Sequence, residues 1–148
     1  MTLALIVEKV SGRAYGYLNE NGTWVLRDQS AASALLGDGG IYSSVEDLAK
    51  WDRALYGTRL VSAKTWQEAV TPGMLNGGKP TEYGFGRELG AYNGHRTWSH
   101  GGGPIGFTTY IARFPDDRVT VILLMHRTDL NPRKTAYAIA GLYLGGGQ

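Results

Sequence analysis

The stretch RTWSHGGGPIGFTTYIARFPDDRVTVILLMH, residues 96–126, predicts three consecutive strands. β-Branched and aromatic residues dominate residues 96–100, 107–114 and 118–126, and glycine, proline and aspartate separate these runs. The break PDD at residues 115–117 is short enough to join the last two strands in a hairpin. We therefore expect an antiparallel meander.

Two more strand-forming regions precede this meander. Residues 12–27 contain the dipeptide Asn21-Gly22, which accepts positive φ in a tight turn and predicts a hairpin. Residues 83–89, YGFGREL, predict one further strand after Pro80.

Helices are expected between the first hairpin and the meander. Ser43 and Glu46 have the spacing of a capping box and predict a helix over residues 43–56. A second helix is expected to start at Ser62 and end before Pro72. The apolar face of the first helix should contain Val45, Leu48, Ala49 and Leu55. That of the second should contain Trp66 and Val70.

The last element is predicted to be a helix, with Asn131 as its N-cap and Pro132 at its first position. Its inward face should contain Ala136, Ala140, Tyr143 and Leu144. The order of hairpin, two helices, meander and helix indicates the α+β class, with an antiparallel sheet flanked by helices.

Composition excludes several kinds of protein. The 148 residues are 43% hydrophobic and carry a net charge of +2, which fits one globular domain and gives no basic surface for nucleic acid. Cysteine is absent, so there is no disulfide, thiolate zinc site or cysteine nucleophile. No apolar run is longer than the one at residues 121–125, which is too short to span a membrane. Residues 1–7 lack the features of a signal peptide, and the compartment stays open.

Three ligand-binding patterns fail on their context. Residues 73–80 follow the Walker A spacing but end in proline, which has no hydroxyl for magnesium. Residues 101–106 match G-x-G-x-x-G, yet a predicted strand follows them where a dinucleotide site needs a helix. His95 and His100 are five residues apart, which suits no regular metal-binding pair. We expect no cofactor and no metal.

Two blocks carry more information. The first is GGIYSSVEDLAKW at residues 39–51, and the second is WSHGGGPIGF at residues 98–107, continued by YIARFPD at 110–116. In this order, with YGFG at residues 83–86 between them, they resemble the C-terminal half of the serine β-lactamase-related family. That family contains class C β-lactamases, penicillin-binding D,D-peptidases and related esterases. The resemblance covers residues 12–144 and implies a partial β-lactamase/transpeptidase-like fold.

The resemblance implies roles for a short run of residues. His100-Gly101-Gly102 matches the family's His-Gly-Gly motif, which lies on a strand at the edge of the active-site cleft. A serine that attacks a carbonyl needs amide donors for the oxyanion and a proton-carrying side chain near the leaving group. By resemblance, the Gly103 amide would be one oxyanion donor and His100 would face the substrate. Gly101 and Gly102 would let the substrate lie against the strand.

The chain departs from the family where the nucleophile is expected. The family's serine lies in Ser-x-x-Lys, and none of the seven serines here has a lysine three residues later. Tyr17-Leu18-Asn19 imitates the middle motif but lies in the predicted hairpin, where the family has an ordinary Gly-Tyr pair. His126 stands where relatives usually have asparagine. We therefore expect one partial domain over residues 1–148 that lacks the nucleophile half.

The sequence leaves open whether this is a natural short protein, a misassigned start or a subunit of a split enzyme. The leading hypothesis is a serine-hydrolase fragment from a family that hydrolyses β-lactams, esters or peptide amides, inactive alone. The alternative is a non-catalytic module that binds a peptide or cell-wall fragment. A degenerate site pairing Ser99 with His100 is a poor third hypothesis, because adjacent strand residues point to opposite faces. Relatives are often exported, which does not fix the localisation of this chain.

The predicted strand at residues 118–126 also bears on partners. In the family this strand is internal, and the resemblance implies that the strand next to it is missing here. Its near-uniform apolar sequence would leave an exposed edge prone to pairing. Either residues 1–7 fold back onto it, or the chain forms a homodimer or binds a complementing N-terminal chain. The competing expectation is a monomer whose helix and loops cover the edge.

Overall fold

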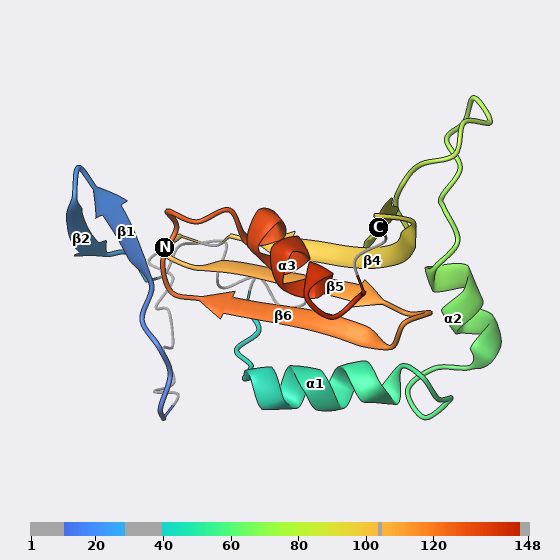
Figure 1. Cartoon of the computed structure of the whole chain (residues 1–148), viewed down its shortest axis with the longest axis horizontal. Helices are drawn as coiled ribbons and strands as arrows, with labels where there is room; N and C mark the ends of the chain where they lie inside the picture. Colours follow the sequence, from blue (N-terminus) through green and yellow to red (C-terminus); the bar gives the residue numbers. More distant parts are fainter. Residues whose placement is uncertain (1–10, 29–39, 104, 146–148) are drawn as a thin grey trace, which may run out of the picture.

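The computed structural model describes residues 11–28, 40–103 and 105–145 (Figure 1). The elements are, in chain order, β1 (Tyr17–Glu20), β2 (Thr23–Leu26), α1 (Val45–Ala54), α2 (Ala63–Ala69), β3 (Glu88–Tyr92), β4 (His95–Gly102), β5 (Thr108–Phe114), β6 (Val119–Met125) and α3 (Pro132–Gly141). Strands β1 and β2 form a small hairpin, and a four-stranded antiparallel sheet has the order β3-β4-β5-β6. The predicted α+β class is confirmed.

The predicted meander is present, and its first strand is longer than expected. Strand β4 extends through Gly101 and Gly102, which pair with Tyr110 and Thr109 of β5. Glycine disfavours strands on entropic grounds, but here both residues lie in a ladder whose other strand is β-branched and aromatic. The first two glycines of the glycine-rich segment, Gly101 and Gly102, therefore belong to strand β4, and the strand ends after them.

The strand expected at residues 83–89 is wrong in its position. Strand β3 occupies Glu88–Tyr92 because Asn93 and Gly94, with φ of 50° and 84°, form the tight turn that pairs it with β4. The preceding residues bend instead, and the Gly84 amide donates to the Arg87 carbonyl at 2.9 Å. A Cβ at Gly84 would overlap the Ala69 carbonyl, so this glycine lets the bend pack on the end of α2.

The predicted β1–β2 hairpin is confirmed, with Asn21 and Gly22 at φ of 54° and 89°. Its base is tied to the large sheet through one amide. The Tyr17 N–H donates to the Gly106 carbonyl at 2.9 Å and to the His126 carbonyl at 3.1 Å. The hairpin therefore docks at two places, the end of β6 and the loop that leads into β5.

The helix boundaries agree with the predicted caps except at α1. Ser62 caps α2 and Asn131 caps α3, with Pro132 in the first turn. Helix α1 is capped by Ser44, whose hydroxyl accepts from the Asp47 amide, so the expected Ser43–Glu46 capping box is wrong by one residue. Two expected inward residues, Val45 and Tyr143, are exposed.

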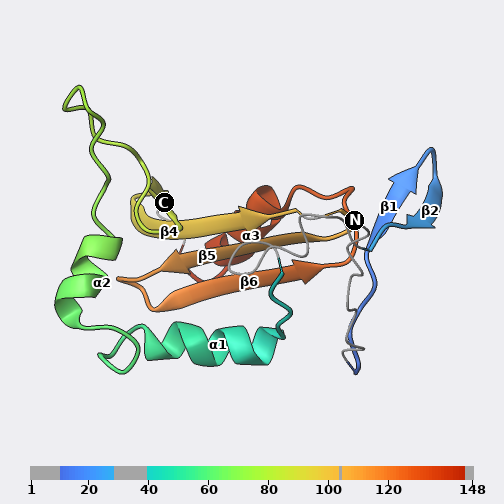
Figure 2. The ribbon, with the colours of Figure 1, turned by 180° about the vertical axis from the view of Figure 1, so that it is seen from behind.

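The core lies between α3 and one face of the sheet. Phe114, Ala112, Ala136 and Ala140 are fully buried there, and Tyr110 and Val121 complete the cluster. In the view from behind, no helix of the described chain crosses the opposite face of β4, β5 and β6 (Figure 2). Helix α1 instead packs beside β6, along the outer side of the sheet. The two faces of the sheet therefore have different environments.

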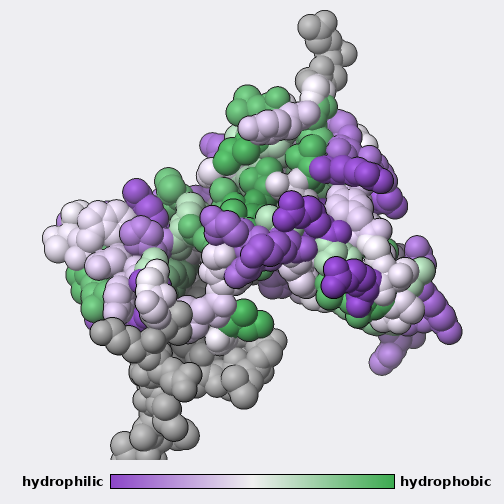
Figure 3. Space-filling model, turned by 90° about the horizontal axis from the view of Figure 1, so that it is seen from below, coloured by the Kyte–Doolittle hydropathy of each residue, from purple (hydrophilic) through white to green (hydrophobic). Residues whose placement is uncertain are grey.

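Strand β6 is the last strand of the sheet within the described residues. Residues 1–7, which were expected to pair with it, lie outside the described part of the chain. From the side of α1, hydrophilic residues form a band across the middle of the molecule, next to hydrophobic surface (Figure 3). Among the helices of the described residues, none is both long and apolar enough to cross a membrane.

Two glycines with similar positive φ angles should differ in how well they tolerate alanine. Gly94 and Gly106 have φ of 84° and 80°, but a Cβ meets nothing within 4 Å at Gly94 and overlaps the Arg27 carbonyl at Gly106. Gly94→Ala should lower the free energy of unfolding by about 1–2 kcal/mol, the left-handed strain alone. Gly106→Ala should lower it by roughly 3 kcal/mol or more, because the hairpin base must move. Urea unfolding followed by circular dichroism measures both, and equal losses would contradict the proposed docking.

Candidate functional site

The candidate site is built around the end of β4. Strand β3 pairs with β4 only from His95 to Ser99, whereas β5 pairs with β4 as far as Gly102. Within the described residues, the outer edge of His100, Gly101 and Gly102 has no strand beside it. This is the bare strand edge against which an extended ligand can form main-chain hydrogen bonds.

His100 and Ser99 lie on opposite faces of β4, as strand alternation requires. His100 is exposed, and its ring meets the Tyr83 ring edge-on at 6.2 Å between centroids. Ser99 is buried on the α3 side, where its hydroxyl accepts from Tyr110 at 3.1 Å and donates to Glu88 at 3.4 Å. The buried serine is therefore neither next to the imidazole nor open to a substrate.

The polar groups behind β4 hold the strand against α3. Burial raises the pKa of Tyr110 to about 12, so its hydroxyl stays protonated and can donate to Ser99. Burial also raises the pKa of the adjacent Tyr137, but hydrogen bonds with Tyr110, Ser99 and Thr97 outweigh it and bring that pKa below its usual value. Because these groups are linked by hydrogen bonds, strand β4 contacts a connected polar layer on its α3 side.

The Gly103 amide follows the paired part of β4. Gly103 is exposed, and a Cβ there would meet only the Phe107 carbonyl, at 3.9 Å. In the part of the chain that the structure describes, no backbone acceptor takes a hydrogen bond from this amide. Among the described residues the Gly103 N–H therefore has no backbone partner, and it lies next to the bare edge.

A small pocket of about 40 Å³ opens on the His100 side of the sheet. Helix α1 contributes Trp51 and Leu55 to its wall. The sheet and the bend before β3 contribute the other side chains, which are Arg87, Trp98, His100, Ile111 and Arg113. A volume of this size holds a few waters or one small polar group.

One lining residue of this pocket, Arg113, belongs to a buried ion pair. Arg113 on β5 and Asp52 on α1 are 3% and 7% exposed, and Arg113 Nε lies 2.9 Å from Asp52 Oδ1. The guanidinium carbon is 4.1 Å from the centre of the Tyr56 ring and 5.6 Å from those of Trp66 and Trp98. Aromatic faces stabilise a desolvated cation, so this cluster fixes α1 and α2 to the sheet.

Arg87 is the second cation of the pocket. It lies 4.6 Å from the centre of the Trp66 ring, and its Nε donates to the Phe85 carbonyl at 3.3 Å. No carboxylate of the described residues forms an ion pair with it. Burial and the nearby charge of Arg113 lower the pKa of Arg87.

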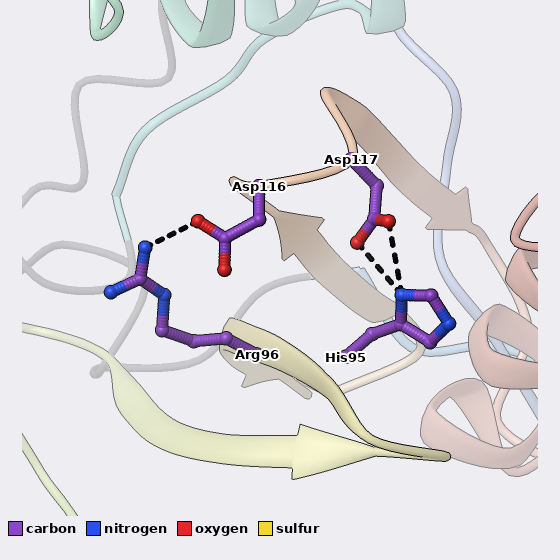
Figure 4. Close-up of polar contacts among 4 residues, drawn as sticks. All are labelled: His95, Arg96, Asp116 and Asp117. Atoms are coloured by element: carbon purple, nitrogen blue, oxygen red, sulfur yellow. Dashed lines mark hydrogen bonds and ion pairs between the residues drawn. The ribbon is translucent and has the colours of Figure 1, made fainter.

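The three histidines do not come together. His95 Nδ1 lies 3.0 Å from both carboxylate oxygens of Asp117, next to the Arg96–Asp116 pair (Figure 4). His126 instead meets the Tyr17 ring edge-on. Within residues 11–28, 40–103 and 105–145 there is no cluster of three potential metal ligands.

The antiparallel sheet with α3 on one face has the penicillin-binding-protein-like hydrolase fold. It superposes on the octameric penicillin-binding protein homologue from Pyrococcus abyssi with a TM-score of 0.79 and 28% identity, over 94% of this chain and 32% of that one. A penicillin-binding protein from Bacillus halodurans gives a TM-score of 0.69 at 20% identity, over 88% of this chain and 40% of that one, which shows the fold alone.

Sequence comparison identifies the family. The Beta-lactamase family model matches residues 2–144, so the chain belongs to this family. It is 33% identical over 132 residues to penicillin-binding protein 4* of Bacillus subtilis (strain 168), covering 82% of this chain and 29% of that protein. D-aminopeptidase of Brucella ovis is 29% identical over 91 residues, or 62% of this chain and 18% of that protein. The chain thus spans less than a third of these two relatives.

His100 and the three glycines after it, which the family motif pointed to, lie together at the end of β4. Arg87, Arg113 and Asp52 were not predicted from the sequence. Asp52 lies between Leu48 and Leu55 on the buried side of α1, where a charged residue interrupts the helical apolar pattern. A charge at such a position was the one available signal of a buried partner.

The buried ion pair should matter far more to stability than a pair on the surface. Asp52→Asn keeps the shape but leaves Arg113 buried without its counter-charge, so the free energy of unfolding should fall by about 3–5 kcal/mol. Asp116→Asn makes the same change in the exposed pair with Arg96 and should cost less than about 1 kcal/mol. Urea unfolding of both variants tests this, and similar losses would show that Asp52 does not fix α1.

Proposed function

We propose that this chain forms the C-terminal part of a serine hydrolase that cleaves an acyl bond, in a β-lactam, an ester or a peptide amide. The observation that carries the proposal is the bare edge of His100, Gly101 and Gly102, followed by the Gly103 amide, which bonds to no described backbone acceptor. The relatives named penicillin-binding protein and D-aminopeptidase support this substrate class. The domain over residues 1–148 would then be a partial one.

In this mechanism the nucleophile is not one of the seven serines of this chain, because none lies in Ser-x-x-Lys. A serine from outside the chain would attack the acyl carbon, and the Gly103 N–H would stabilise the oxyanion that develops. His100 would face the leaving group and assist its departure as a proton carrier. Water would then hydrolyse the acyl-enzyme and restore the serine.

The chain alone should be inactive. We expect no hydrolysis of a chromogenic β-lactam or a p-nitrophenyl ester, and no covalent labelling by a fluorophosphonate probe, because the nucleophile is missing. Mixing with a chain that carries the family's Ser-x-x-Lys half should give activity that His100→Asn lowers and His95→Asn leaves unchanged. His95 is the matched control, since it lies on the other side of β4 with Asp117. Stoichiometric labelling of any serine of this chain would overturn the proposal.

A second candidate is a non-catalytic module that binds a peptide or cell-wall fragment along the same edge. The bare edge of β4 favours it as well, since strand addition needs no nucleophile. The outcome of mixing separates the two candidates: peptide binding without any gain of activity supports the binding module.

We also propose that β6 pairs with another strand, in a homodimer or with a complementing N-terminal chain. Strand β6 ends the described sheet, its sequence is VTVILLM, and Leu124 is 39% exposed. Helix α1 lies beside β6, but the hydrogen-bonded ladder of the described sheet ends at this strand, and such an apolar edge invites strand addition. A relative is octameric, which supports assembly without specifying it.

The association of β6 is tested by sedimentation at micromolar concentrations, with hydrogen exchange of the β6 amides read in parallel. We expect a concentration-dependent dimer, or a complex with the complementing chain, and slow exchange in β6. A stable monomer whose β6 amides exchange quickly would contradict this pairing.

A further inference from the structure

Residues 71–83 form an arm that projects from the body of the molecule, between α2 and the bend before β3 (Figure 1). Residues 71–80 are all exposed, and Met74 and Leu75 near the tip keep 64% and 56% of their surface open. Backbone hydrogen bonds hold the arm as a ribbon, for example from the Leu75 N–H to the Lys79 carbonyl at 3.0 Å. Because these bonds face water and no residue from 71 to 80 is buried, opening the arm locally costs little free energy.

The sequence contains three Asn-Gly dipeptides, at residues 21–22, 76–77 and 93–94. In such a pair the backbone nitrogen of the glycine can attack Cγ of the asparagine side chain, because glycine has no Cβ to hinder the approach. The attack also requires the asparagine to rotate out of its turn, so a firmly held turn opposes it. The three pairs are equivalent in sequence, and the fold makes them different.

The Asn93 pair lies in the most firmly held of the three turns. Asn93 and Gly94 have φ of 50° and 84° and join β3 to β4, whose ladder begins at the adjacent pair of Tyr92 and His95. Strand β4 is paired on its other side with β5, and His95 Nδ1 lies 3.0 Å from the carboxylate of Asp117. Opening this turn would separate strands of the main sheet, so we expect Asn93 to react slowest.

The Asn21 pair is protected by a hydrogen bond. The Gly22 N–H, whose nitrogen would make the attack, donates to Asn19 Oδ1 at 2.8 Å. The surrounding hairpin consists of β1 and β2, which pair with each other and with no third strand of the described chain. Because a two-stranded hairpin is only marginally stable, Asn21 should react at a rate between those of Asn93 and Asn76.

We propose that Asn76 is a site of spontaneous deamidation and the first of the three asparagines to react. The Gly77 nitrogen forms a bond to Asn76 Cγ, the Cγ–Nδ2 bond breaks, and ammonia leaves with the proton of the Gly77 N–H. Water then opens the succinimide ring at either of its carbonyls and leaves an aspartyl or an isoaspartyl residue. No described backbone carbonyl accepts a hydrogen bond from the Gly77 N–H, and a Cβ at this glycine would meet nothing within 4 Å. The approach to Asn76 is therefore open.

The modification needs only water as a co-reactant, so it is independent of the proposed function. Each event adds a negative charge, and the isoaspartyl form also lengthens the main chain by one carbon. That carbon lies inside the turn that the Gly78 N–H closes onto the Leu75 carbonyl at 2.8 Å. At the base of the arm, the Tyr83 carbonyl accepts from the Gly73 N–H, and the Tyr83 ring meets His100. The modified segment thus reaches the candidate site.

The test follows the intact chain in mildly alkaline buffer over days. Peptide mass spectrometry detects the mass gain of replacing the side-chain NH2 by OH at each asparagine. Methyl transfer from S-adenosylmethionine by an isoaspartyl-specific carboxyl methyltransferase detects the isoaspartyl form. In the folded chain we expect Asn76 to convert about tenfold or more faster than Asn93, with Asn21 between them. In concentrated urea the three should convert at similar rates, because the differences belong to the fold.

Variants of the arm show whether the attack by the Gly77 nitrogen is responsible. Gly77→Ala adds a Cβ beside that nitrogen in open space, so the arm should keep its structure and conversion of Asn76 should fall several-fold. Met74→Ala is the matched control, since it changes an exposed residue of the same arm and leaves the pair intact. It should convert as the wild type does.

The proposal fails if Asn21 or Asn93 converts before Asn76 in the folded chain, or if the three rates are equal there. It also fails if Gly77→Ala converts as fast as the wild type, or if Asn76 converts only in urea. The comparison of the three asparagines within the wild-type chain needs no variant, so it decides the matter even if Gly77→Ala does not fold.

Discussion

The ion pair between Asp52 and Arg113 is the constraint on which the His100 side of the sheet depends. Burying both charges is unfavourable unless each keeps its partner, so α1 must stay where its carboxylate can reach β5. That position brings Trp51 and Leu55 against the strand that carries His100. The aromatic rings around Arg113 extend the same constraint to α2, because Trp66 packs edge-on against Trp98 at 5.6 Å.

The α3 side of the sheet is held differently. Its core is made of small and aromatic residues in close contact, such as Ala112, Phe114 and Ala136. Above this core, Ser99, Tyr110 and their neighbours form a satisfied polar layer. Strand β4 thus has a buried face, where Ser99 is hydrogen-bonded, and an exposed face, where His100 lies.

The relatives place these features in a larger context. The chain covers 29% of the Bacillus subtilis relative and 32% of the Pyrococcus abyssi homologue. Most of each of those two proteins therefore lies outside the part that aligns with this chain. Many large apolar side chains are exposed, among them Ile41, Phe85 and Leu142. Exposed apolar side chains that lie close together can meet another element or chain.

Local signals in the sequence determined most of the elements. Turn residues such as Asn21-Gly22 and caps such as Ser62 and Asn131 act within a few residues, so the hairpin, the meander and two helix starts were predictable. The position of β3 was not predictable in the same way. Residues 83–89 have as much strand-forming character as the segment directly before the Asn93-Gly94 turn, and only the pairing with β4 selects the latter. Only tertiary structure decided that Asp52 meets Arg113, 61 residues away, and that Arg87 joins them beside His100. Such long-range pairings depend on how α1 packs against the sheet, and no local pattern in the sequence encodes that packing.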